Sequence, residues 1–448
     1  MVGKASLILV MGFSVIFLVF GFNFNGISNQ TVDNFTDYYK EVAAHNIASS
    51  GANLAADAVF QDNNWTTGYS NLQMDGGEIN VSVQIINASQ NIRKIISVSD
   101  YEGETDTVEV ILSPSRFSQF AYYSENEGSN IRWTGRDTVF GPFHTQDDLL
   151  ADNHPVFGVE GYRTTIKGVL KYVNNESSDK PYFHGSFDNG VDEPLPSNGL
   201  QPLRDAAVDD GDKISQSSST TTTYEHRWIP GHYTRVNGRR QWVDGYYEDI
   251  PTTTTSVDTV YITFMRDSVQ IKLGIAKPST TYLASEIAPN GIIYAEGMDV
   301  RLKGTVQGQY TVVSDGNVYL DDDIVYNTDP RTNPNSTDLL GIVAQNKVLI
   351  TDNNSTQNIN IDAAIYCQDL GFGAQNYDSR SVDGNINLFG GITQNIRQAV
   401  GTYTTDSHGN INIAHGFNKR YRYDERLMQM FPPYFPTTGG FSIVSWKE

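Results

Sequence analysis

The sequence predicts a mainly β protein that begins with one long α-helix, and three observations carry this prediction. An uncharged apolar run at residues 5–22 passes into an amphipathic pattern that ends near residue 60. From residue 76 onward, apolar and polar residues alternate with the period of a half-buried strand. From residue 291, short apolar runs recur between Gly, Asn and Asp and show no helical period.

Length, charge and cysteine content limit the function classes. A chain of 448 residues is too long for one ordinary core, and its patterns divide it into segments 1–62, 63–187, 188–260 and 261–448. The formal net charge of −21 argues against nucleic-acid binding, because a surface that follows phosphates needs clustered Lys and Arg. The one cysteine, Cys367, cannot form an internal disulfide, and its apolar neighbours favour a buried core side chain.

The first segment has the composition of a membrane span. As a helix, residues 5–22 would extend about 27 Å, close to the thickness of a bilayer core. Lys4 precedes the run and the next charged residue, Asp33, is acidic, so the positive-inside rule places the N-terminus in the cytoplasm. The run is longer than that of a secretory signal and lacks a small-residue cleavage site behind it, so we expect it to stay attached.

The helical pattern continues beyond the span. Apolar residues recur there at alternating spacings of three and four, and the small residues between 48 and 56 would let a second helix approach closely. We therefore expect lateral packing against partner helices. The residues predicted to make this contact are Ala5, Leu7, Ile8, Val10, Phe13, Ile16, Phe17, Phe20, Phe35, Tyr39 and Val42.

These features resemble the type IV pilin superfamily. The chain is similar to PilX-like minor pilins and minor pseudopilins in its very short leader ending in Gly3, the apolar helix directly behind it and the small-residue helix at 43–55. The resemblance implies that a prepilin peptidase cuts between Gly3 and Lys4 and that the exposed helix packs in a filament core. Major pilins usually begin with an aromatic residue and carry Glu at the fifth mature position, where this chain has Lys4 and Ile8, which indicates a minor or divergent subunit.

The same resemblance implies partners and a location. The partners would be copies of the chain or other pilin-like subunits, with insertion in the inner membrane before assembly and an extracellular filament at the cell surface afterwards. It implies no cofactor. A plain signal anchor that holds a surface protein without a polymer is the alternative.

Behind the helix the sequence predicts an antiparallel meander. Strands are expected at 79–85, 95–98 and 108–112, with a turn at 100–104, and a helix followed by such strands resembles a pilin head. His144 and His154 are candidate metal ligands farther along. No third ligand stands at matching spacing, so structural roles are favoured and no metal site is predicted.

Residues 220–255 predict a long β-hairpin arm, nearly symmetric about Asn237-Gly238, a dipeptide that favours a type I′ turn. Folding the chain there pairs aromatic with aromatic residues, and pairs the threonines at 220–223 with those at 252–255. Residues 188–219 before the arm predict an acidic linker or surface loop. The arm's aromatic residues are expected either to bind another subunit or surface glycans, or only to pair with one another: Trp228, Tyr233, Trp242, Tyr246 and Tyr247.

The C-terminal segment predicts a right-handed parallel β-helix, with an antiparallel β-sandwich as the alternative. Parts of it, with the ending at 423–448, resemble an uncharacterised family of pilin-tailed surface proteins, and we expect the ending to cover the open edge of the β-helix. The expected strands are short and closely spaced, at 292–294, 300–302, 310–313, 317–320, 341–344, 347–350, 359–361, 363–366 and 385–389.

No catalytic residue is predicted. Asp321, Asp322 and Asp323 are the only clustered carboxylates of this segment, and with no Arg or Lys close by in sequence a solvated turn is favoured over an acid–base set. The chain lacks the nucleophile-elbow, zinc-helix and phosphate-loop motifs. We therefore expect a structural filament subunit and not an enzyme. A surface adhesin that binds glycans or cells is the alternative, and a β-helix enzyme acting on polysaccharides is a less favoured third.

Overall fold

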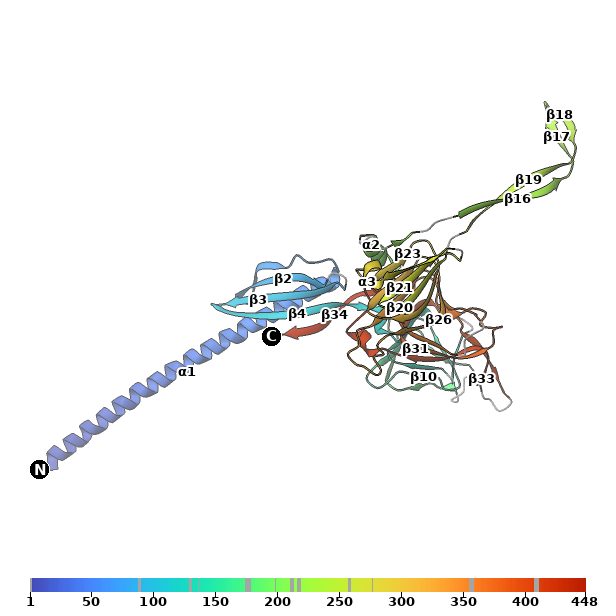
Figure 1. Cartoon of the computed structure of the whole chain (residues 1–448). Coiled ribbons are helices and arrows are strands. Elements are labelled where there is room, and N and C mark those ends of the chain that lie inside the picture. The colour runs from blue at the N-terminus through green and yellow to red at the C-terminus, as the bar shows by residue number, and fades with distance from the viewer. Residues whose placement is uncertain are drawn as a thin grey trace. The chain divides into compact units, whose positions relative to one another are not determined.

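A computed structural model of the chain contains two compact units (Figure 1). The first unit consists of Met1–Ser115 and Gly439–Glu448, and the second of Arg116–Thr438. The structure describes residues 2–87, 90–128, 131–135, 137–173, 179–197, 199–209, 213–215, 219–256, 259–275, 277–353, 358–406 and 411–448. Both units confirm a mainly β protein with one long N-terminal helix.

The first unit combines one helix with a five-stranded sheet. Helix α1 runs without a break over Val2–Gln61, a stretch of 60 residues that contains no proline. The sheet order is β1-β2-β3-β4-β34, and the first four strands pair antiparallel as the predicted meander. The strands are β1 Tyr69–Met74, β2 Gly77–Asn87, β3 Ile92–Tyr101, β4 Glu104–Arg116 and β34 Thr437–Lys447.

Two-residue turns set the register of this meander. Asp75 and Gly76 join β1 to β2, Glu102 and Gly103 join β3 to β4, and all four residues have positive φ. That backbone geometry matches the right-handed twist of the strands it connects. The turn between β3 and β4 is the one predicted at 100–104.

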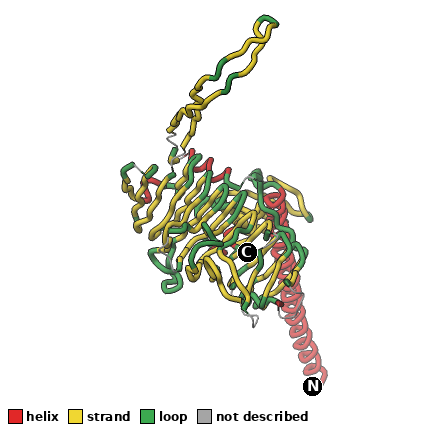
Figure 2. Tube along the Cα trace, turned by 90° about the vertical axis from the view of Figure 1, so that its right-hand side faces the viewer, coloured by secondary structure: helices red, strands yellow, loops and turns green. Residues whose placement is uncertain are grey.

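The second unit is built mainly on one sheet of 22 strands (Figure 2). Short helices accompany it: α2 Gln201–Asp209, α3 Ala284–Ile287, η1 Phe117–Gln119 and η3 Glu425–Met428. The first strands of the unit are β5 Tyr122–Asn126, β6 Trp133–Thr134, β7 Thr138–Phe140, β8 Phe143–Thr145, β9 Leu149–Asp152, β10 Val156–Phe157, β11 Arg163–Ile166, β12 Leu170–Tyr172, β13 Tyr182–Phe183 and β14 Ser186–Asn189. Of these, β6, β9 and β12 form a separate three-stranded sheet.

The later strands of this unit include most of those predicted at the C-terminal end. They are β15 Lys213–Ile214, β20 Val260–Arg266, β21 Ser268–Leu273, β22 Ser279–Leu283, β23 Ile292–Ala295, β24 Val300–Val306, β25 Gln309–Ser314, β26 Val318–Tyr326, β27 Leu339–Ala344, β28 Val348–Ile350, β29 Ile359–Cys367, β30 Phe372–Ala374, β31 Val382–Ile396, β32 Gly401–Thr405 and β33 Ile411–Arg422.

Most pairings in the second unit are parallel, and they form rows. One row stacks β23, β25, β27, β29, β31, β5, β8, β11 and β14, and another stacks β20, β24, β26, β28 and β30. Equivalent residues lie above one another, so that Val300, Val318, Val348 and Phe372 form one buried column. Antiparallel pairs, such as β20 with β21, make the sheet mixed. A closed, right-handed coil stays a prediction.

The arm forms two short ribbons, one after the other. Strands β16 Ser219–Ile229 and β19 Tyr246–Ser256 pair antiparallel, as do β17 His232–Val236 and β18 Arg239–Val243. Asn237 and Gly238 have φ of 48° and 79°, which confirms the predicted turn. The predicted register is confirmed too. The backbone pairs Tyr233 with Trp242, and it pairs the threonines at 220–223 with those at 252–255.

Two predictions for the chain's connections are wrong. The segment at 188–219 includes helix α2, whose Leu203 and Ala207 are buried in the core of the second unit, so it is more than a linker. Of the ending that was predicted to cover an edge of the β-helix, Gly439–Glu448 instead belongs to the first unit, where β34 pairs with β4. An unpaired β4 would be an exposed sheet edge, and β34 removes that liability.

Candidate functional site

The first half of α1 is an apolar surface that no described residue of the chain covers. It holds a window long and apolar enough to cross a membrane, and 0% of that window is buried. Its side chains are large and point in every direction around the axis; Phe17 is 73% and Ile8 is 70% exposed. A helix that is apolar all round requires either lipid or other helices about it.

The predicted packing residues all lie on this helix. Gly3, Lys4 and Ala5 belong to α1 by their backbone, but their side chains are outside the described ones. The remaining residues are exposed by between 38% and 73%, and further apolar neighbours that the prediction omitted, such as Phe22 and Phe24, are exposed as well. They are Leu7, Ile8, Val10, Phe13, Ile16, Phe17, Phe20, Phe35, Tyr39 and Val42.

In the second half of α1, one face of residues 44–59 has its partner within the first unit, whereas Phe35 and Tyr39 before it remain exposed. Ala48, Ala52 and Ala55 are 0% exposed and belong to one core cluster with strands β2, β3 and β4. A Cβ added to Gly51 would lie 2.5 Å from the Ser97 Oγ, which shows how closely helix and sheet approach. The prediction that these small residues face a partner helix is therefore wrong, because the chain's own sheet occupies that side.

The arm exposes a second set of apolar side chains, but these pair with one another. The rings of Tyr233 and Trp242 meet edge to face at 4.8 Å, and those of Trp228 and Tyr247 at 4.9 Å. Each of the four remains at least half exposed, and Tyr246 beside them is 45% exposed. Cross-strand pairing thus explains their alternation without removing them from contact with a partner.

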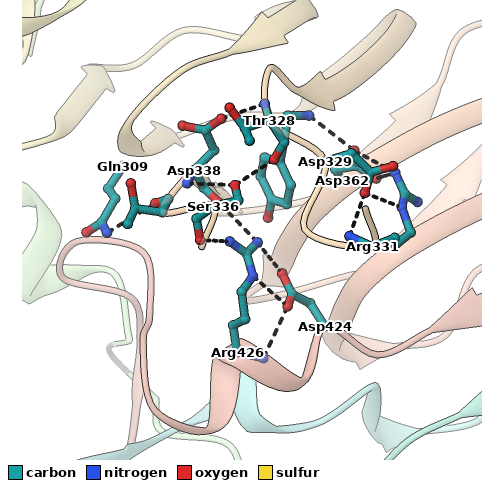
Figure 3. A network of polar contacts seen from close by, with 11 residues as sticks. Gln309, Thr328, Asp329, Arg331, Ser336, Asp338, Asp362, Asp424 and Arg426 are labelled. Atoms are coloured by element: carbon teal, nitrogen blue, oxygen red, sulfur yellow. Dashed lines mark hydrogen bonds and ion pairs between the residues drawn. The ribbon is translucent and has the colours of Figure 1, made fainter. Parts of the chain in front are cut away.

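A polar network in the second unit fixes the loop between β26 and β27 (Figure 3). The Asp338 carboxylate accepts the backbone N–H of Gly308 and of Thr328, each at 2.8 Å. Arg426 donates to the Ser336 carbonyl at 2.8 Å and to the Asp338 carbonyl at 3.0 Å. These charge-assisted bonds attach the loop to the C-terminal segment, and each polar group in them already has a protein partner.

Beside this network lies a buried carboxyl with an altered pKa. Asp362 is 1% exposed, accepts the backbone N–H of Tyr326 at 3.1 Å and contacts the Arg331 guanidinium at 3.2 Å. Burial raises the pKa of Asp362 to about 6, and Arg331 only partly opposes the rise. A carboxyl with a raised pKa can mark a catalytic site. Here, however, Asp362 is covered by the loop between β26 and β27, and its bond to Arg331 helps to hold that loop in place.

The carboxylates at 321–323 do not form a turn. They lie within strand β26, where parallel stacking places Arg301 of β24 against Asp321, with Nε to Oδ2 at 2.9 Å. Asp323 accepts from the Asn360 side chain of β29 at 2.8 Å. The predicted solvated turn is therefore wrong: no Arg or Lys is close by in sequence, but the neighbouring strand of the same row supplies Arg301.

The candidate metal and thiol residues have structural roles. His144 is 0% exposed, its Nδ1 lies 2.7 Å from the Thr165 hydroxyl, and burial lowers its pKa to about 4. His154 contacts the Lys180 carbonyl at 2.8 Å. Burial raises the pKa of Cys367 to about 12, as predicted for a core side chain. In the part of the chain that the structure describes, no group of three His, Cys, Asp or Glu could hold a metal.

Sequence reasoning missed two ion pairs in the interior of the second unit. Arg397 Nη1 lies 2.6 Å from Glu127 Oε2, and Lys419 Nζ lies 2.7 Å from Asp137 Oδ2. The partners are more than 260 residues apart in the sequence. No local pattern signals such a pair, and only the stacking of β7 against β33 brings the second one together.

Comparisons with known proteins add little to these observations. No known protein family matches the chain, and no curated protein matches it. Among solved structures, the competence-associated pilin ComZ from Thermus thermophilus is similar, with a TM-score of 0.34 and 12% identity, over 91% of this chain and 97% of that one. A TM-score of this size does not establish a common fold. The features of the chain itself define its class: a mainly β protein with one long, apolar N-terminal helix.

Proposed function

We propose that this chain is a structural subunit of an extracellular type IV pilus-like filament, related to the PilX-like minor pilins. The N-terminal helix would sit in the inner membrane before assembly and in the filament core afterwards, against copies of the chain or other pilin-like subunits. The units behind the helix would face outward at the cell surface. In this proposal the protein turns over no substrate and needs no cofactor.

One observation carries the proposal: the two halves of α1 differ in what covers them. In the second half, one face of residues 44–59 is buried on the sheet of the first unit, whereas no residue of the apolar window is buried. Burial of apolar surface contributes about 25 cal/mol per Å², so a helix with this many exposed Leu, Val, Ile and Phe side chains is strongly driven toward lipid or toward other helices. A subunit that moves from a membrane into a filament core would cover these side chains both before assembly, with lipid, and after it, with other helices.

Two finer parts of the proposal depend on the sequence. Cleavage between Gly3 and Lys4 would leave the whole apolar window in the mature chain, because the window lies within Ser6–Gln61, behind the cleaved bond. The second unit is proposed to be a right-handed parallel β-helix, supported by the parallel rows whose equivalent residues stack in columns. Such a stack would expose a long rigid flank on the outside of a filament.

The native N-terminus tests the proposal most directly. We expect mass spectrometry of surface filaments to find Lys4 as the first residue, and cryo-electron microscopy to find a central bundle of helices. A Gly3→Leu variant should block cleavage and incorporation, whereas Val2→Leu, which leaves the cleaved bond unchanged, should assemble normally. An intact Met1 on a chain that never enters a filament would refute the proposal and favour the plain signal anchor.

The exposed aromatic residues of the arm favour a second function, adhesion. Trp228 and Trp242 are each 51% exposed, and such rings stack on sugars or dock on proteins. Cells that carry Trp228→Ala with Trp242→Ala should lose binding to surface glycans or host cells while filament number stays constant. Unchanged binding in a glycan array and in a cell assay would exclude this role for the arm.

A further inference from the structure

The interior of the second unit contains an ion pair between the ammonium of Lys419 and the carboxylate of Asp137. Lys419 of β33 and Asp137, just before β7, have side chains 6% and 0% exposed. The Lys419 Nζ lies 2.7 Å from the Asp137 Oδ2. The contact is direct, and the aromatic ring of Trp133 lies 5.2 Å from the same Nζ.

A second ion pair beside it limits the charge that this region can hold. The Arg397 guanidinium lies 4.0 Å from the Trp133 ring and is paired with Glu127, whose carboxylate also accepts from the Tyr122 hydroxyl at 2.7 Å and the Trp133 indole at 2.8 Å. That pair is fully hydrogen bonded. The positive charge of Arg397 disfavours a second positive charge nearby, so the neutral amine of Lys419 is more favourable here than it would be in water.

Burial acts in the same direction. It lowers the pKa of Lys419, Arg397 lowers it further, and Asp137 opposes both. A lowered pKa makes the neutral amine of a lysine easier to reach, and that form carries the lone pair of a nucleophile. A buried ion pair is costly to desolvate, and conversion of both charged groups to a neutral amide would remove that cost.

We propose that Lys419 and Asp137 condense to form an intramolecular amide between Nζ and Cγ. A proton first passes from the ammonium to the carboxylate, and the neutral amine then attacks Cγ. The bond from Cγ to Oδ1 breaks, and this oxygen leaves as water with two of the three protons that the ammonium held. One proton stays on the amide nitrogen, so atoms and charge balance without any oxidant or further reactant.

The surrounding groups match the needs of this step. The Thr134 backbone N–H donates to Asp137 Oδ2 at 3.0 Å, where it would stabilise the charge that develops on the oxygen that remains. The Tyr403 hydroxyl lies 3.4 Å from Oδ1, where it can donate to the oxygen that leaves. Thr134, Tyr403 and Lys419 all line a cavity of about 630 Å³, which offers the released water an exit.

The bond would join strands that are distant in sequence. The paired residues are 282 positions apart, and β7 stacks directly on β33 with Thr138 opposite Arg420. An amide at this place closes a very long loop and prevents the early strands of the second unit from separating from the late ones. That constraint suits a protein whose stability cannot come from a disulfide, because it has one cysteine.

The intact mass of the full chain, purified in detergent and then denatured, tests the proposal. We expect a mass lower than that of the sequence by one water, and a branched peptide that joins the segments holding residues 137 and 419. Lys419→Arg should restore the full mass and remove the branched peptide. The pair of Arg397 and Glu127 is an internal control, because a guanidinium does not condense and its peptides should be recovered separately.

A second variant keeps the proposal testable if Lys419→Arg fails to fold. Asp137→Asn offers an amide as the acyl donor, so condensation would release ammonia and give a product of the same mass as the condensed parent chain. Recovery of the parent chain at its full mass, with both segments as separate linear peptides, would overturn the proposal and leave an ordinary buried ion pair. Because this readout does not depend on assembly, it stays separate from the test of the filament function.

Discussion

The two halves of α1 are one continuous helix with opposite surroundings. In the first half, large apolar side chains such as Phe17 are exposed and no described residue covers them. In the second half, small side chains such as Ala52 are 0% exposed beneath β2 and β3. The residues that look most like a core by composition are thus the ones the fold leaves outside.

This difference separates folding from assembly. Side-chain size decides which half can lie on the sheet, because Ala and Gly allow a close approach that Phe and Leu would prevent. The first unit therefore folds on the second half alone, and the first half stays available for lipid or partner helices. Substitutions in the two halves should have separable effects. Two predictions test this directly, and two more with smaller effects extend the comparison to the second unit.

A charge in the first half should abolish assembly without unfolding the first unit. Phe13→Asp places a carboxylate near the middle of the apolar window, at a cost of about 3 kcal/mol or more in a membrane or a helix bundle. We expect no filaments by electron microscopy and a normal circular dichroism spectrum for the β units. Phe13→Leu keeps the surface apolar and should assemble. Filaments at normal number from Phe13→Asp would contradict the proposed role of this half.

A matched pair of isoleucines compares the halves directly. Ile47 is 2% exposed in the core of the first unit, so Ile47→Ala should lower its free energy of unfolding by about 3 kcal/mol. Ile27 is 63% exposed, so Ile27→Ala should leave that free energy unchanged within about 0.5 kcal/mol. Urea denaturation followed by circular dichroism measures both. Equal losses would show that the first half also has a partner inside the folded chain.

Local patterns were enough to predict the elements that depend on neighbouring residues. The extent of α1, the strands of the meander and the register of the arm follow from period, turn residues and cross-strand pairs. The rung of Tyr233 with Trp242 is an example, because Asn237-Gly238 fixes the turn and the turn fixes every pair behind it. In these elements, sequence distance and spatial distance agree.

Contacts between distant segments could not be predicted in this way. Strand β5 stacks on β31, so that Tyr122 lies opposite Ile392, and no periodicity relates the two. The same holds for Arg301 beside Asp321 of the next strand in its row, for Lys419 beside Asp137, and for β34 on β4. Each arises from the order in which strands stack, which a single sequence does not reveal.

The second unit extends the comparison to a polar group that the fold covers. Burial raises the pKa of Asp362 from 3.8 to about 6, so the folded state binds a proton more tightly than the unfolded state does. The resulting stability is present at low pH and is lost as the pH rises through about 6, a loss of about 2 kcal/mol from about pH 4. Asp362→Asn should remove this part of the pH dependence. Thermal unfolding across that range measures the difference, and identical slopes in both proteins would contradict it.

The smallest effect is expected in the arm. Its aromatic side chains are exposed, as in the first half of α1, but they contact one another within the chain, as the side chains of the second half contact the sheet. Tyr233 and Trp242 should show a coupling energy of about 1 kcal/mol in a double-mutant cycle, typical of an edge-to-face pair. Hydrogen exchange of the β17 and β18 amides measures it, with the next rung, Thr234 and Gln241, as the control. The main unfolding transition of the second unit should not move, since the ribbon pairs only with itself among the described strands. A coupling near zero would contradict the stabilising contact between these two rings.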